Sequence, residues 1–289
     1  VLLDWNMPGM NGAELCERIK QSRNDFYTYV ILITSRADSD DIVVGLESGA
    51  DDYITKPVVA AELNARLNSA LRVIDFEKKL KEKEIEVRLN CYKTLTQLAE
   101  TRDHESEGHM TRVGEFCAMI GKEMGLSEKQ CEKLRVFAPM HDIGKVGIPD
   151  GILHVPRELC SEEFQVIKMH TQIGWQILKD KQVFETAATI AYTHHEHWDG
   201  TGFPRHLKGE KIPLEGRICA VADCYDSLRS VRSYRSEANH EQVVSWISLS
   251  SGKLFDPKVV EAFQKIEKDI EKIFDSTYRL SVEDSPLRQ

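Results

Sequence analysis

The sequence has little of what marks a membrane protein, a nucleic-acid-coating protein or a disulfide-bonded protein. It has no run of about 18 or more apolar residues, the length that predicts a membrane-spanning helix, and no signal-peptide pattern. The net charge of −9 excludes a basic surface for a nucleic-acid polymer. The seven cysteines are scattered and lack paired metal-ligand spacing, so we expect reduced thiols. These absences predict a cytoplasmic protein with neither a membrane nor a nucleic-acid polymer as partner.

Two further absences divide the chain into parts. No histidine occurs in the first hundred residues, because all ten lie between His104 and His240, which predicts a domain boundary near residue 100. Neither Gly nor Pro occurs over residues 60–100, a charged stretch that predicts a long helix. At 289 residues, the chain is long enough for two domains with separate cores. The predicted parts are a first segment over 1–60, a helical linker over 61–98, a second domain over 99–275 and a tail over 276–289.

The first segment alternates apolar strands with helices, which predicts a parallel α/β sheet. The predicted elements are a strand, a helix, a strand, a helix and a strand over 1–3, 13–20, 29–33, 39–48 and 52–55. Asp4, Thr34 and Lys56 follow the three strands. Because functional groups gather at the carboxyl ends of parallel strands, this set suits an acceptor, a hydroxyl sensor and a phosphate-pairing cation. The alternative is an acidic loop on an inert α/β fragment.

This segment resembles the second half of a response-regulator receiver domain. The resemblance implies that Asp4 is the phosphorylation site, that Thr34 and Lys56 are the switch residues, and that Pro57 follows a cis bond. It also implies a sensor histidine kinase as partner and Mg²⁺ as a cofactor of the intact receiver. The family's first strand, first helix and second strand are missing, together with the acidic pair that helps bind Mg²⁺. The chain opens in mid-strand at Val1 without an initiator Met, so we expect a fragment in which Asp4 is not phosphorylated.

The linker has an apolar stripe that needs a partner to bury it. Its residues recur at helical spacing, for example Leu63, Leu67 and Leu71, but the charged stretch 81–84 interrupts them and the heptads are irregular. We expect a parallel coiled coil that makes the protein a homodimer. A solvated helical spacer is the alternative.

The second domain repeats one arrangement, in which a potential metal ligand stands beside an apolar helical stripe. The predicted helices cover 103–124, 127–140, 162–178, 187–192 and 217–228. The candidate ligands are Glu105, His109, His141, Asp142, His170, His194, His195 and Asp223. Each has a plainer interpretation by itself. Glu105 and His109, at i and i+4 on one predicted helix face, also suit a surface pair, and a lone His170 is more often a core residue.

Taken together, these residues predict a site for more than one metal ion. Nitrogen and carboxylate ligands without a thiolate fit iron or manganese better than structural zinc. Such a cluster generates a hydroxide nucleophile and clamps phosphoryl oxygens, which is the chemistry of phosphodiester hydrolysis. Lys145 lies close enough to Asp142 in the chain to point at the same site, although a solvated Lys is the plainer alternative. The Gly-rich loop 198–204 can lie over the site and admit a flat, polar substrate.

The second domain resembles the HD-GYP family of cyclic di-GMP phosphodiesterases over about residues 98–274. The matching pieces are His141 to Lys145, His194 to Glu196, Trp198 to Pro204, Ala222-Asp223 and Phe255 to Pro257. The resemblance implies an all-α domain that opens cyclic di-GMP to linear pGpG, sometimes continuing to GMP. The fold class expected for the chain is therefore multidomain, a partial α/β receiver with a parallel sheet, then a linker helix and an all-α domain.

The resemblance also implies roles for single residues. The eight candidate ligands would hold two or three divalent metal ions, with Asp142 bridging and Glu105 going with the third ion. Asp142 and Lys145 would be catalytic, and the substrate would contact Lys145, Asp226, Arg232 and Arg235. The Gly-Phe-Pro loop would contact GGDEF-type or adaptor proteins.

The chain departs from the family pattern without losing a ligand. Phe203 replaces the signature Tyr, Thr171 a common Pro, and Ser233 the Pro usual between the two arginine positions. We therefore expect catalysis to be retained. Two rival functions are a degenerate sensor that binds cyclic di-GMP and acts through protein contacts, and a metal-dependent phosphohydrolase of mononucleotides.

Overall fold

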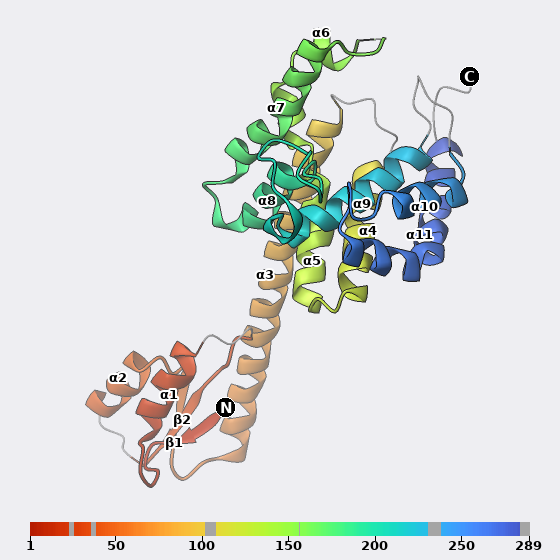
Figure 1. The fold of residues 1–289 in the computed structure, drawn as a ribbon. Helices are drawn as coiled ribbons and strands as arrows, with labels where there is room; N and C mark the ends of the chain where they lie inside the picture. The colour runs from red at the N-terminus through yellow and green to blue at the C-terminus, as the bar shows by residue number, and fades with distance from the viewer. Residues whose placement is uncertain (23–25, 36–38, 102–107, 156, 231–237, 284–289) are drawn as a thin grey trace. The chain divides into compact units, whose positions relative to one another are not determined.

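The computed structural model describes residues 1–22, 26–35, 39–101, 108–155, 157–230 and 238–283 (Figure 1). Contacts divide the chain into two units, Val1–Asn90 and Cys91–Gln289. In the described ranges, no helix is both long and apolar enough to cross a membrane.

The first unit contains a parallel sheet in the order β1-β2-β3, as the sequence predicts. The strands are β1 (Leu2–Asp4), β2 (Ile31–Thr34) and β3 (Asp52–Thr55), joined through the helices α1 (Gly12–Gln21) and α2 (Ser39–Glu47). Both helices lie on one face of the sheet and the start of α3 on the other (Figure 1). At the start of α1, a Cβ on Gly12 would lie 2.4 Å from the Asp4 carbonyl oxygen. Only glycine therefore lets this helix begin so close to the end of β1.

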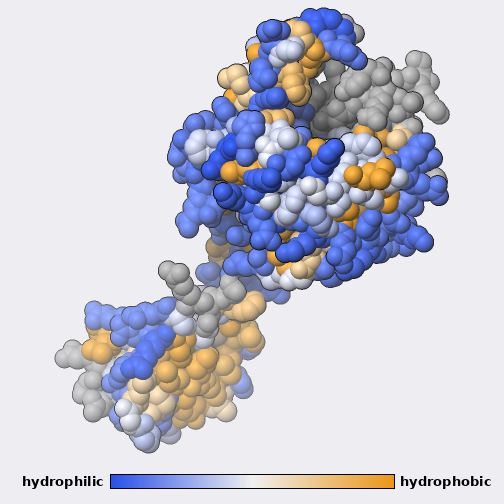
Figure 2. Space-filling view, in the orientation of Figure 1, coloured by the Kyte–Doolittle hydropathy of each residue, from blue (hydrophilic) through white to orange (hydrophobic). Residues whose placement is uncertain are grey.

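Apolar burial in the first unit is incomplete. Its core contains Leu3, Cys16 and Leu32, among others. By contrast, Leu2 is 43% and Phe26 81% exposed, and Figure 2 shows a broad apolar area on the visible face of this unit.

The long helix predicted for the linker is present as α3 (Ala60–Glu100). Ion pairs at helical spacing, such as Lys79 to Asp75 at 2.7 Å, run along its surface. Several apolar side chains on it remain exposed, including Leu71 and Phe76. Tyr92, near its end, packs against the rings of Phe137 and Phe184 in the second unit.

The second unit is all-helical, which confirms the predicted fold class. Its α-helices are α4 (His109–Glu123), α5 (Glu128–Phe137), α6 (Asp150–Leu153), α7 (Ser161–Leu178), α8 (Glu185–Thr193), α9 (Leu214–Arg229), α10 (His240–Leu249) and α11 (Pro257–Glu283). Its largest core cluster joins α4, α5 and α8 to α11, with Phe116, Tyr225 and Phe263 fully buried. This cluster fixes α4 against α9, the two helices that carry His109 and Asp223.

Two helix boundaries near the candidate ligands differ from the prediction. The helix expected from Asp103 begins at His109, after Gly108 in the left-handed conformation at φ +80°. Residues 102–107 lie outside the described part, so whether Glu105 joins His109 at the site remains a prediction. Helix α5 ends at Phe137, three residues before the predicted end. The chain then forms the 3-10 turns η1 (Ala138–Met140) and η2 (Ile143–Gly147). Pro139 lacks the amide hydrogen of a regular α-helix, which suits the change.

Candidate metal centre

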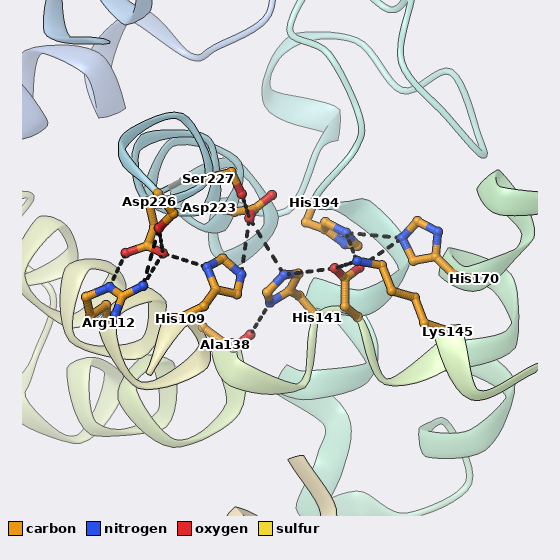
Figure 3. A network of polar contacts seen from close by, with 12 residues as sticks. His109, Arg112, Ala138, His141, Lys145, His170, His194, Asp223, Asp226 and Ser227 are labelled. Atoms are coloured by element: carbon orange, nitrogen blue, oxygen red, sulfur yellow. Dashed lines mark hydrogen bonds and ion pairs between the residues drawn. The ribbon is translucent and has the colours of Figure 1, made fainter. Parts of the chain in front are cut away.

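The candidate ligands come from separate helices that converge on the 3-10 turns (Figure 3). His141 and Asp142 lie between η1 and η2, His170 lies in α7, and His194 is the C-cap of α8. A Cβ on Gly144 would lie 1.9 Å from the carbonyl oxygen of His170. The glycine after the His-Asp pair therefore allows α7 to bring His170 up to Asp142.

The structure gathers seven of the eight candidate ligands into two neighbouring groups. One contains Asp142, His170, His194 and His195, and the other His109, His141 and Asp223; within each group the ligand atoms lie within 4.8 Å of one another. His141 Nε2 lies 3.4 Å from Asp142 Oδ2 and 3.8 Å from Asp223 Oδ1. Asp142 therefore stands where the groups meet. Glu105 lies outside the described residues.

Three of the histidines share one orientation that suits metal ligands. Their Nδ1 atoms face backbone carbonyl oxygens, at 3.0 Å for His141 and Ala138, 2.6 Å for His170 and Ile167, and 3.1 Å for His194 and Ile190. Because a carbonyl oxygen only accepts, each Nδ1 carries a hydrogen, which leaves Nε2 as the atom that can bind a metal. Histidines that bind metals are oriented by such a hydrogen bond in most proteins.

Buried polar atoms at the junction fit a bound cation. Among the described residues, His141 Nε2 and Asp142 Oδ1 are buried without a hydrogen-bond partner. Leaving such atoms unsatisfied costs free energy that a metal ion would recover. Together with the nitrogen and oxygen donor set, this indicates a site suited to divalent metal ions.

Burial and neighbouring charge set the protonation of the site. Burial opposes the charged form of Asp142, but Lys145 and His141 outweigh it and hold the pKa of this carboxyl well below its usual range. Burial lowers the pKa of His194 and, strongly, that of His195, so both rings stay neutral. Burial also opposes the charge on His141, but Asp142 outweighs it and raises the pKa of His141 to about 10. A metal ion must therefore displace a proton from His141.

Lys145 points at the same site, as the sequence predicts. Its Nζ lies 2.6 Å from Asp142 Oδ2, and its side chain is 15% exposed. Ser227, which the sequence does not single out, donates a hydrogen bond to Asp223 Oδ1 at 3.0 Å. These contacts hold both carboxylates beside the histidines, and Figure 3 shows that of Asp223 next to His109 and His141.

Asp226, which the resemblance gives as a substrate contact, lies inside the protein. It is fully buried behind His109, whose Nδ1 lies 2.7 Å from Asp226 Oδ2. Arg112 binds the same carboxylate from Nε at 2.5 Å and from Nη2 at 2.9 Å. Both oxygens are therefore held from within, and the contact of Asp226 with a substrate remains a prediction. The sequence does not reveal the part of Arg112, since an Arg on an amphipathic helix normally lies at the surface.

The Gly-Phe-Pro loop lies against the group of ligands that contains His195. The rings of Phe203 and His195 are stacked, with centroids 4.8 Å apart at 26°. Buried Glu196 accepts hydrogen bonds from the backbone nitrogens of Arg205 at 2.7 Å and Leu207 at 2.8 Å. The carboxylate beside His195 thus holds the loop in place. Arg232 and Arg235, predicted to bind substrate, lie outside the described residues.

The three receiver positions meet at one edge of the sheet. Thr34 is buried at the end of β2, and its carbonyl accepts from the backbone nitrogen of Lys56 at 2.8 Å. The Lys56 ammonium forms an ion pair with Asp4, and the bond to Pro57 is cis. The pair lowers the pKa of Asp4 through the hydrogen bond from Lys56.

An all-α domain whose helices bring a His-Asp pair together with further His and Asp side chains defines an HD-type metal domain. Residues 93–259 match the family described as HD domain, and residues 1–68 match the response regulator receiver domain. The chain therefore belongs to the HD domain family and carries a receiver segment before that domain. Both resemblances seen in the sequence are confirmed.

Two curated relatives match most of the chain, and a third matches somewhat more than half of it. A "Cyclic di-GMP phosphodiesterase" of Thermotoga maritima is 40% identical, covering 94% of this chain and 80% of the relative. The "Cyclic di-GMP phosphodiesterase response regulator RpfG" of Xanthomonas campestris is 35% identical, covering 94% of this chain and 76% of the relative. The "3'3'-cGAMP-specific phosphodiesterase 2" of Vibrio cholerae is 38% identical over 58% of this chain and 32% of the relative.

Proposed function

We propose that this protein is a metal-dependent phosphodiesterase that hydrolyses cyclic di-GMP to linear pGpG, a reaction that in the family sometimes continues to GMP, under the control of a receiver domain. The observation that carries the proposal is the pair of ligand groups meeting at Asp142 beside Lys145. The relatives that cover 94% of the chain are named for the same reaction, and one of them is named a response regulator.

The residues would hold two divalent ions, with iron or manganese fitting the donors best. His109, His141 and Asp223 would hold one, and Asp142 with His170, His194 and His195 the other. When bound, such ions activate water as a nucleophile and neutralise phosphoryl oxygens. The resemblance adds Glu105 for a third ion.

Lys145 would act directly on the substrate. Its ammonium group has three donors and already lies against Asp142, so it can turn to a phosphate oxygen that binds there. In that position it would stabilise developing negative charge and protonate the leaving oxygen. Arg232 and Arg235 are proposed to bind the phosphates or guanines, while Phe203 offers a ring next to the ligands.

The remaining parts would regulate the reaction. In an intact receiver, a sensor histidine kinase would phosphorylate Asp4 with Mg²⁺ bound, and Thr34 and Lys56 would respond. The apolar side chains exposed along α3 support a homodimer formed through this helix. GGDEF-type or adaptor proteins would contact the Gly-Phe-Pro loop. The domain bounds 1–60, 61–98, 99–275 and 276–289, and the cytoplasmic location, belong to this proposal.

One experiment tests the reaction and its main rival together. Protein purified without oxygen is analysed for metal and incubated with cyclic di-GMP, with 3'3'-cGAMP in parallel, and the products are separated by chromatography. We expect pGpG from the wild type and no product from the double variant His141→Ala with Asp142→Ala. Binding of cyclic di-GMP without hydrolysis by the metal-loaded wild type would support the sensor instead. Full activity of the double variant at wild-type metal content would overturn the assignment.

A further inference from the structure

We infer that Asp226 and Arg112 form a buried positioning pair that holds His109 with its Nε2 lone pair directed at the metal centre, and that α11 braces this pair through Phe274. The inference rests on the proposed metal site, but its test needs no substrate. It gives Asp226 a role different from binding the substrate.

His109 needs an acceptor that the other histidines find in their own helical turns. His141, His170 and His194 each direct Nδ1 at a carbonyl three or four residues earlier. His109 is the first residue of α4, so the carbonyls before it are not part of that helix. Asp226, on α9, supplies the acceptor at 2.7 Å from Nδ1. Because a carboxylate only accepts, His109 carries its hydrogen on Nδ1.

The opposite edge of the His109 ring then faces the ligands. Its Nε2 lies 3.6 Å from Asp223 Oδ1, within the group that also contains His141. Figure 3 shows the order Arg112, Asp226, His109 and Asp223 running toward the site. A rotation or change of tautomer at His109 would remove a nitrogen ligand from this group.

Arg112 neutralises the buried charge of the Asp226 carboxylate and fixes the orientation of its plane. Asp226 is 0% and Arg112 1% exposed, and the guanidinium binds both carboxylate oxygens, at 2.5 and 2.9 Å. A buried charge without a partner is strongly destabilising, and a planar fork holds a carboxylate in one orientation as a lysine cannot. Arg112 lies one helical turn after His109, so α4 carries the ligand together with the cation that orients its acceptor.

Phe274 extends the pair to the C-terminal helix. Its buried ring lies 5.1 Å from the Arg112 guanidinium carbon and 4.8 Å from that of Arg229. Arg229 also pairs with Asp275 at 2.9 Å. The ring is thus within cation–π distance of both guanidinium groups and restricts them. Helix α11 therefore packs against the Asp226–Arg112 pair on the side away from the ligands.

The first test reads the tautomer in the metal-free full chain. Imidazole nitrogen shifts are measured by ¹⁵N NMR, and the His109 signals are assigned by their loss in His109→Gln. We expect the Nδ1–H tautomer in the wild type. Observation of the Nε2–H tautomer would overturn the inference, and this measurement requires no variant of Asp226 to fold.

The second test compares two buried Asp–Arg pairs. In Asp226→Asn, the amide can donate to His109 Nδ1 and shift the hydrogen to Nε2, so we expect Mn²⁺ affinity to fall about 10- to 100-fold at one site, as for other residues that orient ligands. The matched control is Asp256→Asn, because buried Asp256 binds Arg217 and the backbone of Lys258. We expect this control to lower stability and leave Mn²⁺ affinity unchanged. Equal losses of affinity in both variants, or none in either, would contradict the positioning role.

A milder variant covers the case in which Asp226→Asn fails to fold. Phe274→Leu keeps an apolar side chain but removes the ring against Arg112, and we expect Mn²⁺ affinity to fall by roughly threefold to tenfold, below the effect of removing the acceptor itself. Unchanged affinity would contradict the bracing role of α11. None of these measurements uses substrate, so they remain valid even if the protein does not hydrolyse cyclic di-GMP. In the same way, an Nε2–H tautomer at His109 would overturn the positioning role without affecting the proposed phosphodiesterase function.

Discussion

The two units each contain an Asp–Lys pair at a proposed functional position, and the pairs differ mainly in exposure. In the receiver segment, the side chains of Asp4 and Lys56 are 39% and 41% exposed. In the HD domain, those of Asp142 and Lys145 are 7% and 15% exposed. Water screens the first pair, so it contributes little to stability. The second pair is largely removed from water, so neighbouring charged groups decide whether Asp142 and Lys145 stay ionised.

This difference fits two kinds of chemistry. An exposed carboxylate at the edge of a sheet is accessible to a phosphate donor, and its lysine can move to the new charge. The buried carboxylate of Asp142 has Lys145 Nζ at 2.6 Å and His141 Nε2 at 3.4 Å from Oδ2, and these two cations hold its pKa well below the usual range. It therefore stays ionised and suits a shared metal ligand.

The largest contrast should appear when each aspartate becomes asparagine. Asp142→Asn removes the charge shared by the ligand groups, so we expect hydrolysis of cyclic di-GMP to fall by at least about 10³-fold and metal content to drop. Asp4→Asn should leave both unchanged in this chain. Product formation and metal analysis on the two variants provide the check. Equal losses of activity and metal in the two variants would show that the difference in exposure does not correspond to a difference in role.

Replacing the lysines should give the next largest contrast. In Lys145→Ala we expect kcat to fall by about 10²- to 10³-fold, because a charge-stabilising donor is lost, with metal content kept. Lys56→Ala should match the wild type in both. Steady-state kinetics beside metal analysis distinguish the outcomes; a loss of metal in Lys145→Ala would mean that this lysine holds the site together instead.

The buried site should also respond to pH. The pKa of His141 is raised to about 10, so in the metal-free protein at neutral pH its ring carries a proton that a metal must displace. The affinity for Mn²⁺ should therefore rise with pH, by up to roughly tenfold per pH unit at pH values below the pKa of His141. Mn²⁺ titrations at several pH values, with calorimetry in two buffers to count released protons, measure this. Affinity independent of pH, with no proton released, would contradict it.

The smallest effect concerns the stability of the first unit. Since the Asp4–Lys56 pair is exposed, Lys56→Ala should not resolvably change the urea midpoint of unfolding. Arg66, which pairs with Asp52 at 2.5 Å and Glu62 at 2.8 Å, is less exposed, so Arg66→Ala serves as the comparison and should lower the midpoint more. A larger loss in Lys56→Ala would reverse this order.

Much of the fold could be predicted because its signals are local. The strands ending near Asp4 and Thr34, and the linker helix over 60–100, follow from apolar periodicity and from the absence of Gly and Pro. The candidate ligands could also be identified in this way, since His and Asp beside apolar helical stripes are uncommon. Helix starts were less certain, as the start of α4 at His109 shows.

The sequence by itself determined the elements, the kinds of ligand and their order along the chain, because residue type and short spacing carry that information. Only the tertiary structure decided that His109, His141 and Asp223 form one group and that Asp142 joins it to the other. It also turned Asp226 inward to His109 and buried Arg112 behind it. The physical reason is that these contacts join helices far apart in the chain, so burial and facing direction depend on packing that no local pattern records.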